Sequence, residues 1–419
     1  MTDKKLSTES YKGVRDFYPE DAAIQQYIFN TWAKTAESFG FDRYDASILE
    51  PSDLYRAKGA ENEEMVNEQT YTFTDRGERE VTLRPEMTPT IARMVAGKAR
   101  ELAFPLRWYS IPNLFRYERP QKGRLREHWQ LNCDIFGSDS VAADVEIIAL
   151  AHQTMINFGA TNELFEIRIN DRQLMQRLYR AIGLNDDLIP KITHLNDRKN
   201  KISREEYLDA LNSITNDETI TEEVIMLLEK SDEQTDVVIG LEELGITNVV
   251  FDKSLARGFD YYTGTIFEIF ELDGEGRSTG RSMLGGGRYD NLTSMFGGKP
   301  ISGIGFGMGD VTMRDFLEAH NLIPGKARCT SAKVTIIPET SEQNLYAEVV
   351  AKRVRETGVA VSTDLGTQKL DKKKARASER GVKFIIVIGE NEAITAKDIT
   401  TGDKKSGQIT EIINFLNTK

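Results

Sequence analysis

Residues that form covalent or metal cross-links are scarce in this sequence. Its 419 residues include two cysteines, Cys133 and Cys329, and four histidines, with no C-x-x-C and no H-E-x-x-H pattern. Disulfide-held domains need many more cysteines, and zinc sites need closely spaced Cys or His ligands. We therefore expect two unpaired thiols, a reducing compartment and no dedicated transition-metal site.

Long hydrophobic runs are also missing. The longest, such as residues 384–388, fall far short of the ~20 residues that span a bilayer. The first residues, Met-Thr-Asp-Lys-Lys, lead into polar sequence rather than an apolar signal segment. These features predict a cytoplasmic protein with no membrane partner.

Basic residues are in the minority, because 66 acidic residues outnumber 54 basic ones and give a net charge of −12. Non-specific nucleic-acid binding draws its energy from Lys and Arg at the phosphates, so this balance argues against a general nucleic-acid coat. Local basic patches remain compatible with it. The 39% hydrophobic and 29% charged content is typical of a globular protein, and the length predicts two or three domains.

The hydrophobic pattern predicts a sheet with packed helices. Ile24, Ile28 and Trp32 recur at helical spacing in a helix over 21–39, which Gly40 ends. Residues 71–75 and 81–84 flank a glycine-containing turn and predict a hairpin, and the other expected strands are 41–49, 106–118, 129–136, 265–272 and 303–308. Because regular helices do not separate these strands, an antiparallel sheet is favoured over a doubly wound one.

Two further segments differ from this part in composition. Residues 171–244 are helical in character and rich in Asp, Glu, Asn and Lys, so we interpret them as an insertion. Beyond a linker-like stretch near Pro324, strands over 333–338, 359–363 and 383–389 alternate with helices, the first of which follows a Thr340/Gln343 capping-box pattern. This alternation predicts a small α/β domain with a mainly parallel or mixed sheet.

The segment 115–126, between two expected strands, is strongly basic for an acidic protein. Guanidinium groups bind phosphate oxygens through paired hydrogen bonds, so a loop of this kind suits a polyphosphate. The alternative is a charged loop that only faces water. The basic residues of the segment are Arg116, Arg119, Lys122, Arg124 and Arg126.

Glycine alternates with apolar residues over 303–309, which read Gly-Ile-Gly-Phe-Gly-Met-Gly. In a strand this period places every glycine on one face, where a flat ring or a second backbone can lie. The segment does not match a dinucleotide fingerprint, and Gly298-Lys299-Pro300 does not match a P-loop. We expect Gly305 and Gly307 to face a nucleotide, with tight packing as the alternative.

Residues 255–264 combine a cation, a carboxylate and two tyrosines directly before an expected strand. Arg257 suits a phosphate or a carboxylate, while Asp260, Tyr261 and Tyr262 can hydrogen-bond a polar ring. The alternative is that the two aromatic side chains belong to the core.

Taken together, these segments resemble the class II aminoacyl-tRNA synthetases, and specifically the histidyl-tRNA synthetase family. FRYERPQKGRLREHWQLNCDIFG (115–137) is similar to the family's second class motif, and ARGFDYYTGTIFE (256–268) is similar to its histidine-specific element. KGVRDFYPED (12–21), TLRPEMTPTIAR (82–93) and GGGRYDNL (285–292) resemble three further stretches. The likeness covers most of the chain, in order and at sensible spacing.

This resemblance implies an α+β fold. A class II catalytic domain, an antiparallel sheet with packed helices, would comprise residues 1–170 and 245–325, with a helical insertion over 171–244 and an anticodon-binding α/β domain over 331–419. The implied ligase joins L-histidine to the α-phosphate of ATP as histidyl-adenylate and transfers the histidyl group to the 3′ end of histidine tRNA. That reaction relies on positioning and charge neutralisation, which agrees with the lack of a Ser/His/Asp pattern.

The family match also implies how ATP is held. Arg116 would bind the α-phosphate, with Arg257 as the second cation there, and these two are the implied catalytic residues. Arg124 would reach the distal phosphates and Glu118 would lie near the adenine. Mg²⁺ is expected to accompany ATP.

Histidine must be held by its ammonium group and its imidazole. The resemblance implies that Glu86, Thr88 and Gln130 bind the ammonium, while Asp134 and Tyr262 face the ring nitrogens. Many family members carry Glu at position 134, so Asp134 keeps the charge but is one methylene shorter. The complete implied site is Glu86, Met87, Thr88, Gln130, Asp134, Arg257, Tyr261, Tyr262 and Tyr289.

The third class motif departs from the family pattern. After the glycine strand the family has an apolar residue, Glu and Arg, whereas this chain reads Asp310-Val311-Thr312. The arginine that would stack on adenine and hold the γ-phosphate is therefore missing at Thr312. Arg314 lies about 200° around a helix from Thr312 and cannot simply replace it. Arg119 and Arg288 are the other candidates.

Histidine tRNA, L-histidine, ATP and a second copy of the chain are the partners that the resemblance implies. The segment around Pro51 resembles the family's dimer interface. Phosphate contacts would give affinity for tRNA without sequence information. Candidate contacts to the tRNA backbone in the C-terminal domain are Lys372, Lys373, Lys374 and Arg376.

Two functions of other classes compete with the ligase. One is a catalytically silent paralogue resembling the regulatory subunit that partners the first enzyme of histidine biosynthesis. Such relatives typically lack the arginine element and the C-terminal domain, yet Arg257 and residues 331–419 are present here. The other is a tRNA-binding module without activity, against which the intact pocket residues argue.

Overall fold

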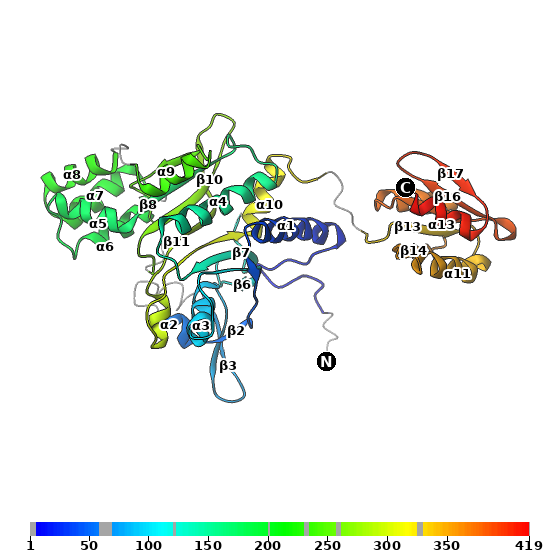
Figure 1. Cartoon of the computed structure of the whole chain (residues 1–419), viewed down its shortest axis with the longest axis horizontal. Helices are drawn as coiled ribbons and strands as arrows, with labels where there is room; N and C mark the ends of the chain where they lie inside the picture. Colours follow the sequence, from blue (N-terminus) through cyan, green and yellow to red (C-terminus); the bar gives the residue numbers. More distant parts are fainter. Residues whose placement is uncertain are drawn as a thin grey trace. The chain divides into compact units, whose positions relative to one another are not determined.

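The computed structural model describes residues 6–57, 69–119, 123–199, 202–229, 234–256, 261–324 and 330–418. Two compact units make up the chain (Figure 1). One comprises the residues up to Asp16 together with Ile28–Leu322, and the other comprises Phe17–Tyr27 together with the residues from Ile323 onward.

A nine-stranded sheet forms the framework of the first unit. Its strand order is β1-β5-β7-β12-β11-β10-β8-β9, with β6 paired to β7. The central pairs are antiparallel, whereas β1–β5 and β8–β9 at the two edges are parallel. This architecture confirms the antiparallel sheet that the sequence predicted. The strands are β1 (Asp42–Arg43), β5 (Leu106–Ser110), β6 (Asn113–Phe115), β7 (Glu127–Phe136), β8 (Phe165–Asp171), β9 (Val249–Phe251), β10 (Thr265–Leu272), β11 (Ser278–Arg288) and β12 (Gly303–Gly309).

The two faces of this sheet differ in polarity because side chains alternate along each strand. On β7, Leu131, Cys133 and Ile135 are fully buried. Met308 of β12 lies beneath Trp32, whose indole Nε1 is 2.9 Å from the Met308 sulfur. Helices α1 (Pro19–Ser38), α4 (Val141–Asn157) and α10 (Asp310–Ala319) pack against the apolar face of the sheet. The other face of β7 therefore carries polar side chains.

A three-stranded sheet of order β2-β4-β3 stands beside the framework. The expected hairpin is confirmed, since β3 (Tyr71–Thr74) pairs antiparallel with β4 (Glu80–Leu83). The prediction of a single strand over residues 41–49 is wrong. The chain forms β1 in the large sheet, leaves it, and forms β2 (Leu49–Pro51) in the small one. Helices α2 (Asp53–Arg56) and α3 (Thr88–Lys98) complete this region.

Helices α5 to α8 form a cluster with its own apolar core at one end of the large sheet (Figure 1). Helix α9 (Asp236–Glu243), although within the expected insertion, packs on α4. A Cβ atom at Gly240 would come within 2.8 Å of the Val145 side chain. The clustered helices are α5 (Arg172–Ala181), α6 (Ile189–Asp197), α7 (Arg204–Thr215) and α8 (Glu218–Glu229).

The second unit carries a five-stranded sheet of order β14-β13-β15-β16-β17. Its first three strands are parallel and its last two antiparallel, which confirms the predicted mixed sheet. Thr340 and Gln343 form the expected capping box. The elements are β13 (Val334–Pro338), α11 (Asn344–Arg355), β14 (Val361–Thr363), α12 (Leu370–Glu379), β15 (Phe384–Ile388), β16 (Ile394–Asp398), β17 (Lys404–Ser406) and α13 (Ile409–Asn417).

Candidate active site

A polar cavity of about 50 Å³ opens on the face of the large sheet that the helices leave free. Strand β7 supplies three adjacent same-face side chains, and β11 and β12 supply backbone. The segment before α3 and the tyrosines before β10 contribute the other walls. The lining residues are Glu86, Thr88, Arg116, Gln130, Asn132, Asp134, Tyr261, Tyr262, Gly285, Tyr289, Gly305, Phe306 and Gly307.

The glycines of β12 make room for side chains of the neighbouring strand. Gly305 pairs with Asp134 and Gly307 with Asn132. A Cβ atom at Gly305 would collide with Oδ1 of Asp134, and one at Gly307 would lie 2.7 Å from Cδ of Gln130. Asp134 and Gln130 therefore lie across the bare backbone, so part of the glycine face is already covered by the chain itself.

Asp134 is buried at the floor of the cavity and accepts a hydrogen bond from the hydroxyl of Tyr289. Burial raises the pKa of this carboxyl to about 7, although the Tyr289 hydrogen bond acts in the opposite direction. Burial, together with the nearby Asp134 carboxylate, raises the pKa of Tyr289 as well. At neutral pH the pair can therefore both donate and accept hydrogen bonds, which suits an imidazole ring.

Three tyrosine rings line one side of the cavity. The ring of Tyr261 lies 4.8 Å from that of Tyr262 and 6.0 Å from that of Tyr289, measured between centroids. The Tyr261 hydroxyl donates to Oε2 of Glu86 at 3.3 Å, and Glu86 is buried. This wall can enclose an apolar part of a ligand while Glu86 offers a carboxylate to a cation.

Thr88 is the first residue of α3, and the proline that follows it favours a helix start there. This start directs Thr88 into the cavity. Met87 is also buried, but the structure does not place it among the lining residues. Arg116 lines the cavity, and its Nε donates to the carbonyl of Pro85 at 2.9 Å, which fixes the guanidinium at the rim.

Two residues expected at ATP lie outside this cavity. The Arg124 guanidinium is 3.4 Å from Oε2 of Glu118, and its side chain is 59% exposed against 14% for Glu118. Both belong to the basic loop that follows Arg116. Arg257 and Asp260 lie outside the described residues. Before that segment, the carbonyl of Leu255 accepts a hydrogen bond from Asn170 Nδ2 at 2.8 Å. After it, Tyr262 lines the cavity.

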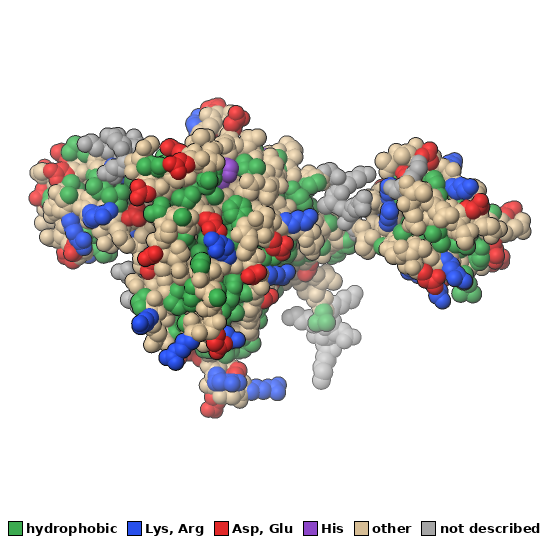
Figure 2. Space-filling model, viewed as in Figure 1, with side chains coloured by type: hydrophobic (Ala, Val, Ile, Leu, Met, Phe, Trp, Pro, Cys, Tyr) green, Lys and Arg blue, Asp and Glu red, His purple; other side chains and the backbone are tan. Residues whose placement is uncertain are grey.

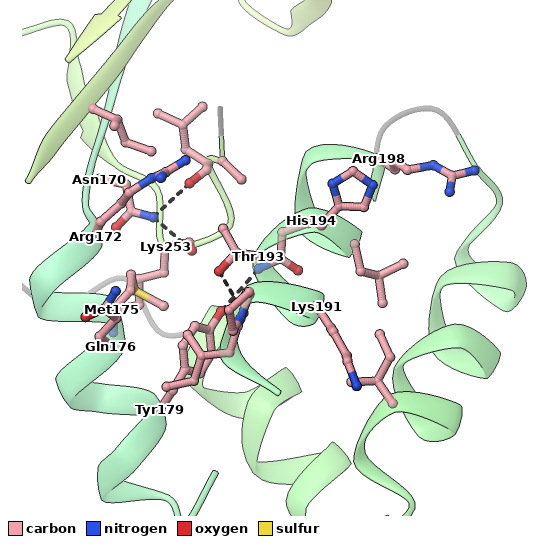
Figure 3. Close-up of a pocket in the computed structure, with 18 of the residues that line it drawn as sticks. Asn170, Arg172, Met175, Gln176, Tyr179, Lys191, Thr193, His194, Arg198 and Lys253 are labelled. Carbon is pink, nitrogen blue, oxygen red and sulfur yellow. Dashed lines mark hydrogen bonds between the residues drawn. The ribbon is translucent and has the colours of Figure 1, made fainter. Parts of the chain in front are cut away.

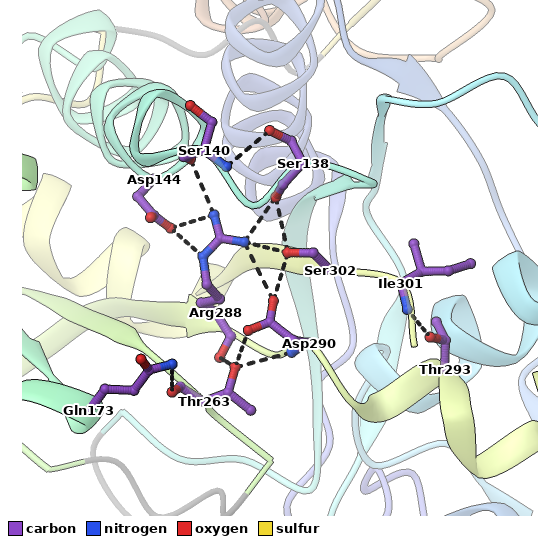
Figure 4. A network of polar contacts seen from close by, with 10 residues as sticks. All are labelled: Ser138, Ser140, Asp144, Gln173, Thr263, Arg288, Asp290, Thr293, Ile301 and Ser302. Atoms are coloured by element: carbon purple, nitrogen blue, oxygen red, sulfur yellow. Dashed lines mark hydrogen bonds and ion pairs between the residues drawn. The ribbon is translucent and has the colours of Figure 1, made fainter. Parts of the chain in front are cut away.

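Arg288, one candidate for the missing third-motif arginine, is committed elsewhere (Figure 4). Its Nε donates to Asp144 Oδ1 at 3.0 Å, and its Nη1 donates to the Ser138 carbonyl at 2.9 Å and to Ser302 Oγ at 2.5 Å. Burial raises the pKa of Asp144 to about 6, with Arg288 opposing the rise. This guanidinium holds α4 to β11 and is not among the cavity-lining residues.

The position of the missing arginine is occupied by Thr312, whose hydroxyl lies 3.2 Å from the Gly309 carbonyl. Beside it, Asp310 is buried and accepts from Arg15 Nη2 at 2.7 Å and from the backbone N–H of Trp129 at 2.9 Å. Burial raises the pKa of Asp310, and the Arg15 charge opposes this. The contact joins the N-terminal segment to β7 and to the start of α10.

Sequence reasoning did not single out one residue that lines the cavity, Asn132, or several residues that lie outside its lining. Asn132 follows Gln130 by two positions on β7, so period-two alternation could have found it. His128 precedes Gln130 by the same step, and burial together with Arg116 and Arg15 lowers its pKa to about 3. The Arg15–Asp310 pair joins residues 295 positions apart, and no local pattern indicates it.

One residue of the basic helix in the second unit differs from its expected role. Lys373 is buried, and its ammonium donates to the Pro338 carbonyl at 3.1 Å. Arg376 forms an ion pair with Asp364 at 2.6 Å. Lys373 is therefore a structural residue rather than a contact to an RNA backbone, while Lys372 is exposed. On the face of the molecule that Figure 2 shows, Lys and Arg side chains are interspersed with Asp and Glu side chains.

Within the described ranges, no three His, Cys, Asp or Glu side chains are grouped so that they could hold a metal ion. In the same ranges, no helix has both the length and the apolar character needed to cross a bilayer.

Cys133 is buried and unpaired, and burial raises the pKa of its thiol.

Comparison with known proteins identifies two matching family models. The model described as histidyl-tRNA synthetase matches residues 13–310, and the anticodon binding domain matches residues 333–419. A histidine–tRNA ligase of Leptospira biflexa is 40% identical over 440 aligned positions, covering 99% of both chains. One of Thermoplasma volcanium is 36% identical and covers 98% of this chain and 99% of its own length.

Solved structures show the same fold. A histidyl-tRNA synthetase of Nostoc superposes with a TM-score of 0.80 at 21% identity, covering 99% of this chain and 100% of the other. The apo S. aureus histidyl-tRNA synthetase gives a TM-score of 0.73 at 24% identity, covering 98% and 100%. The α+β fold expected from the sequence, with its antiparallel sheet, packed helices and small C-terminal α/β domain, is thereby confirmed.

Proposed function

The chain belongs to the histidyl-tRNA synthetase family, and from this premise we propose that it activates L-histidine with ATP and transfers the histidyl group to the 3′ end of histidine tRNA. The curated relatives that share its full length are histidine–tRNA ligases. The observation that carries the assignment to this site is the cavity in which two buried carboxylates, three tyrosines and Arg116 meet.

Recognition of histidine follows from the polarity of the cavity. Glu86, buried beside Thr88 and Gln130, supplies a negative charge for the ammonium group. Asp134, whose carboxylate already accepts from Tyr289, would offer an acceptor to one ring nitrogen, and Tyr262 in the cavity wall would face the other. An apolar amino acid would leave these buried groups unpaired, and such mismatches discriminate strongly between substrates.

Activation requires the histidine carboxylate to attack the α-phosphate in line with the departing pyrophosphate. Arg116 is positioned by the Pro85 carbonyl at the rim of the cavity, where it would neutralise charge that develops on the α-phosphate. The walls hold the two reactants in a fixed orientation, which lowers the entropic part of the barrier. No side chain has to abstract a proton in this step, because the attacking carboxylate is already ionised.

The nucleotide would extend from Arg116 towards the basic loop. There Arg124 would meet the distal phosphates and Glu118 would lie near the adenine, with Arg257 as the second cation at the α-phosphate. Gly305 and Gly307 would contribute backbone beside Asp134 and Gln130. ATP would arrive as its Mg²⁺ complex, in which the metal neutralises phosphate charge.

The domains divide the remaining tasks. We assign catalysis to residues 1–170 and 245–325, an accessory role to the helical insertion 171–244, and anticodon binding to residues 331–419. Homodimer formation through the region of Pro51 is supported by β2, an edge strand on which Leu49 is 43% exposed. A cytoplasmic location is part of the same proposal.

ATP–pyrophosphate exchange tests this function directly. The full chain is incubated with ATP, labelled pyrophosphate and each of the twenty amino acids in turn, and only histidine should support exchange. Arg116→Ala and Arg257→Ala should each abolish exchange while the circular dichroism spectrum is retained. Exchange that is absent with histidine, or equal with several amino acids, would contradict the proposal.

A further inference from the structure

A second cavity, of about 770 Å³, lies where the helical cluster meets the main sheet (Figure 3). Its lining comes from α5, α6 and α7 on one side, and from Asn170, Lys253 and Ile266 at the ends of sheet strands on the other. None of these residues lines the first cavity. The volume falls within the range of roughly 300–1,000 Å³ that is typical of small-molecule sites.

The charged residues of this lining are all basic. Arg172, Lys191, Arg198 and Lys253 line the cavity, and among the described residues no Asp or Glu does so. In a chain whose acidic residues outnumber its basic ones, such a lining is a local inversion of charge. A concave surface with one sign of charge concentrates ligands of the opposite sign.

The rest of the lining is mainly apolar. Met175, Ile189 and Ile214 contribute side chains from three different helices. The polar groups of Tyr179 and Asn196 already bond to each other at 3.1 Å, so they place little demand on a ligand. In Figure 3, the side chains of α5 and α6 approach from separate helices around this space. These walls suit the apolar ring of a small organic molecule.

The second cavity shares a wall with the first. Leu255 and Ile266 line the second cavity, Tyr262 and Tyr289 line the first, and all four pack in one apolar cluster. Arg172 Nη1 donates to the Tyr262 carbonyl at 3.1 Å, and its guanidinium lies 5.9 Å from the centre of the Tyr262 ring. A ligand that moves Arg172 would therefore act on a residue of the histidine site.

We propose that this second cavity binds a small organic anion carrying an apolar ring, and that its occupancy is coupled to the histidine cavity through Arg172 and Tyr262. The binding part stands independently of the proposed function, whereas the coupling part rests on it. Walls contributed by three helices and a sheet favour a small molecule over a nucleic-acid strand. Coupling of this kind is reciprocal, since each ligand must change the affinity of the other by the same factor.

A pair of dyes matched in shape provides the binding test. 8-Anilinonaphthalene-1-sulfonate carries the required ring and charge, and N-phenyl-1-naphthylamine has the same rings without the sulfonate. Fluorescence titration of the full chain should show a saturable sulfonate site. Ala210→Trp, which places a large side chain in the cavity wall, should abolish that site.

The role of the positive charge in the cavity is tested at exposed residues, because substitutions there do not disturb the packed core. Lys191→Glu combined with Arg198→Glu should weaken the sulfonate about tenfold or more, equal to about 1.4 kcal/mol, and leave the uncharged dye unchanged. Arg177→Glu is the matched control, because Arg177 is exposed on α5 but does not line the cavity. Equal sulfonate binding in the wild type, the double variant and Ala210→Trp would overturn the proposal.

The coupling is read from exchange kinetics. A saturating concentration of the sulfonate dye should change the KM for histidine severalfold in the wild type but not in Ala210→Trp. An unchanged KM in the wild type would contradict the proposed coupling between the two cavities. If the wild type bound the dye but supported no exchange, the proposed function would fail while the site remained. Displacement of the dye by tRNA but not by 1-naphthalenesulfonate would assign the cavity to RNA and overturn the proposal.

Discussion

The hydroxyl of Tyr289 donates a hydrogen bond to the carboxylate of Asp134 inside the polar cavity. The ring of Tyr289 fits there because position 303 is glycine, where a Cβ atom would come within 2.6 Å of that ring. Gly305 leaves room for Asp134 in the same way. Gly303 and Gly305 thus leave space for the Tyr289 ring and the Asp134 carboxylate. Side chains at these two positions of β12 would occupy that space.

Asp134→Asn should stabilise the protein at high pH while removing histidine recognition. The folded-state pKa of Asp134 is raised to about 7, so the folded carboxyl retains a proton that the unfolded chain loses near pH 4. Its contribution to the free energy of unfolding therefore falls as pH rises from about 4 to 7, and by pH 8 the penalty reaches a few kcal/mol at most. Asn removes this titration and still accepts from Tyr289.

Urea unfolding at pH 5 and pH 8 measures this effect. Relative to the wild type, Asp134→Asn should gain more stability at pH 8 than at pH 5. In the exchange assay its KM for histidine should rise at least about 100-fold, since a buried ligand hydrogen bond to a charged group is lost. A variant with normal histidine KM would show that Asp134 does not contact the substrate.

Gly305→Ala should disturb both folding and activity, because its Cβ atom would collide with Asp134 Oδ1 and lie 2.6 Å from the Cys133 carbonyl. Forcing an extra methyl group into packed structure costs about 1–3 kcal/mol, and here it also displaces the carboxylate. Gly298→Ala is the matched control, since a Cβ atom there would have no neighbour within 4 Å. Equal melting temperatures for the two variants would contradict this explanation of the glycine strand.

The sequence predicted some strands from their local patterns and missed others. One missed strand is β8, where the apolar residues Phe165, Ile167 and Ile169 do alternate, and another is β11. Residues 265–272 were predicted as a strand and form β10. Strand β11 (Ser278–Arg288) was not predicted, because Ser, Gly and Arg lack the apolar alternation of a strand. It is held as a strand by antiparallel pairing with β10 and β12 on its two sides. That constraint is tertiary, so no local window reveals it.

The candidate site shows the same division. The resemblance named Glu86, Gln130 and Asp134, and the structure brings all three to one cavity. It also raised Arg288 as a substitute cation, whereas Arg288 bonds to Asp144 from α4. A guanidinium pattern in sequence cannot distinguish a phosphate ligand from a buried ion pair, since both require the same donor geometry.

Arg288→Met should therefore act on stability rather than on ATP affinity. Removing the guanidinium leaves Asp144 buried without its main partner, and breaking a buried pair typically costs about 3–5 kcal/mol. The additional change Asp144→Asn should recover part of this loss, because the carboxylate most deeply buried beside Arg288 then carries no unpaired charge. Urea unfolding of both single variants and the double variant gives the coupling energy. A stable Arg288→Met protein with a raised KM for ATP would instead assign Arg288 to the nucleotide.

Arg15→Met tests whether the N-terminal segment positions the nucleotide end of the site. Asp310 accepts from Arg15 and from the N–H of Trp129, the residue that precedes Gln130 on β7. Without Arg15, burial would favour the protonated carboxyl, which binds the Trp129 N–H more weakly and loosens β7 against α10. Exchange activity should fall about tenfold at saturating histidine, corresponding to about 1.4 kcal/mol in the barrier.

The double variant Arg15→Met with Asp310→Asn separates positioning from direct contact with ATP. The neutral asparagine side chain of this variant accepts from the Trp129 N–H without requiring a cation, so most of the lost rate should return if Arg15 acts through Asp310. Arg43→Met is the control for removing an exposed basic residue of the same unit. If the double variant stays as slow as Arg15→Met and its KM for ATP is raised, Arg15 binds the nucleotide itself. In that case Arg15 supplies the cation that Thr312 lacks.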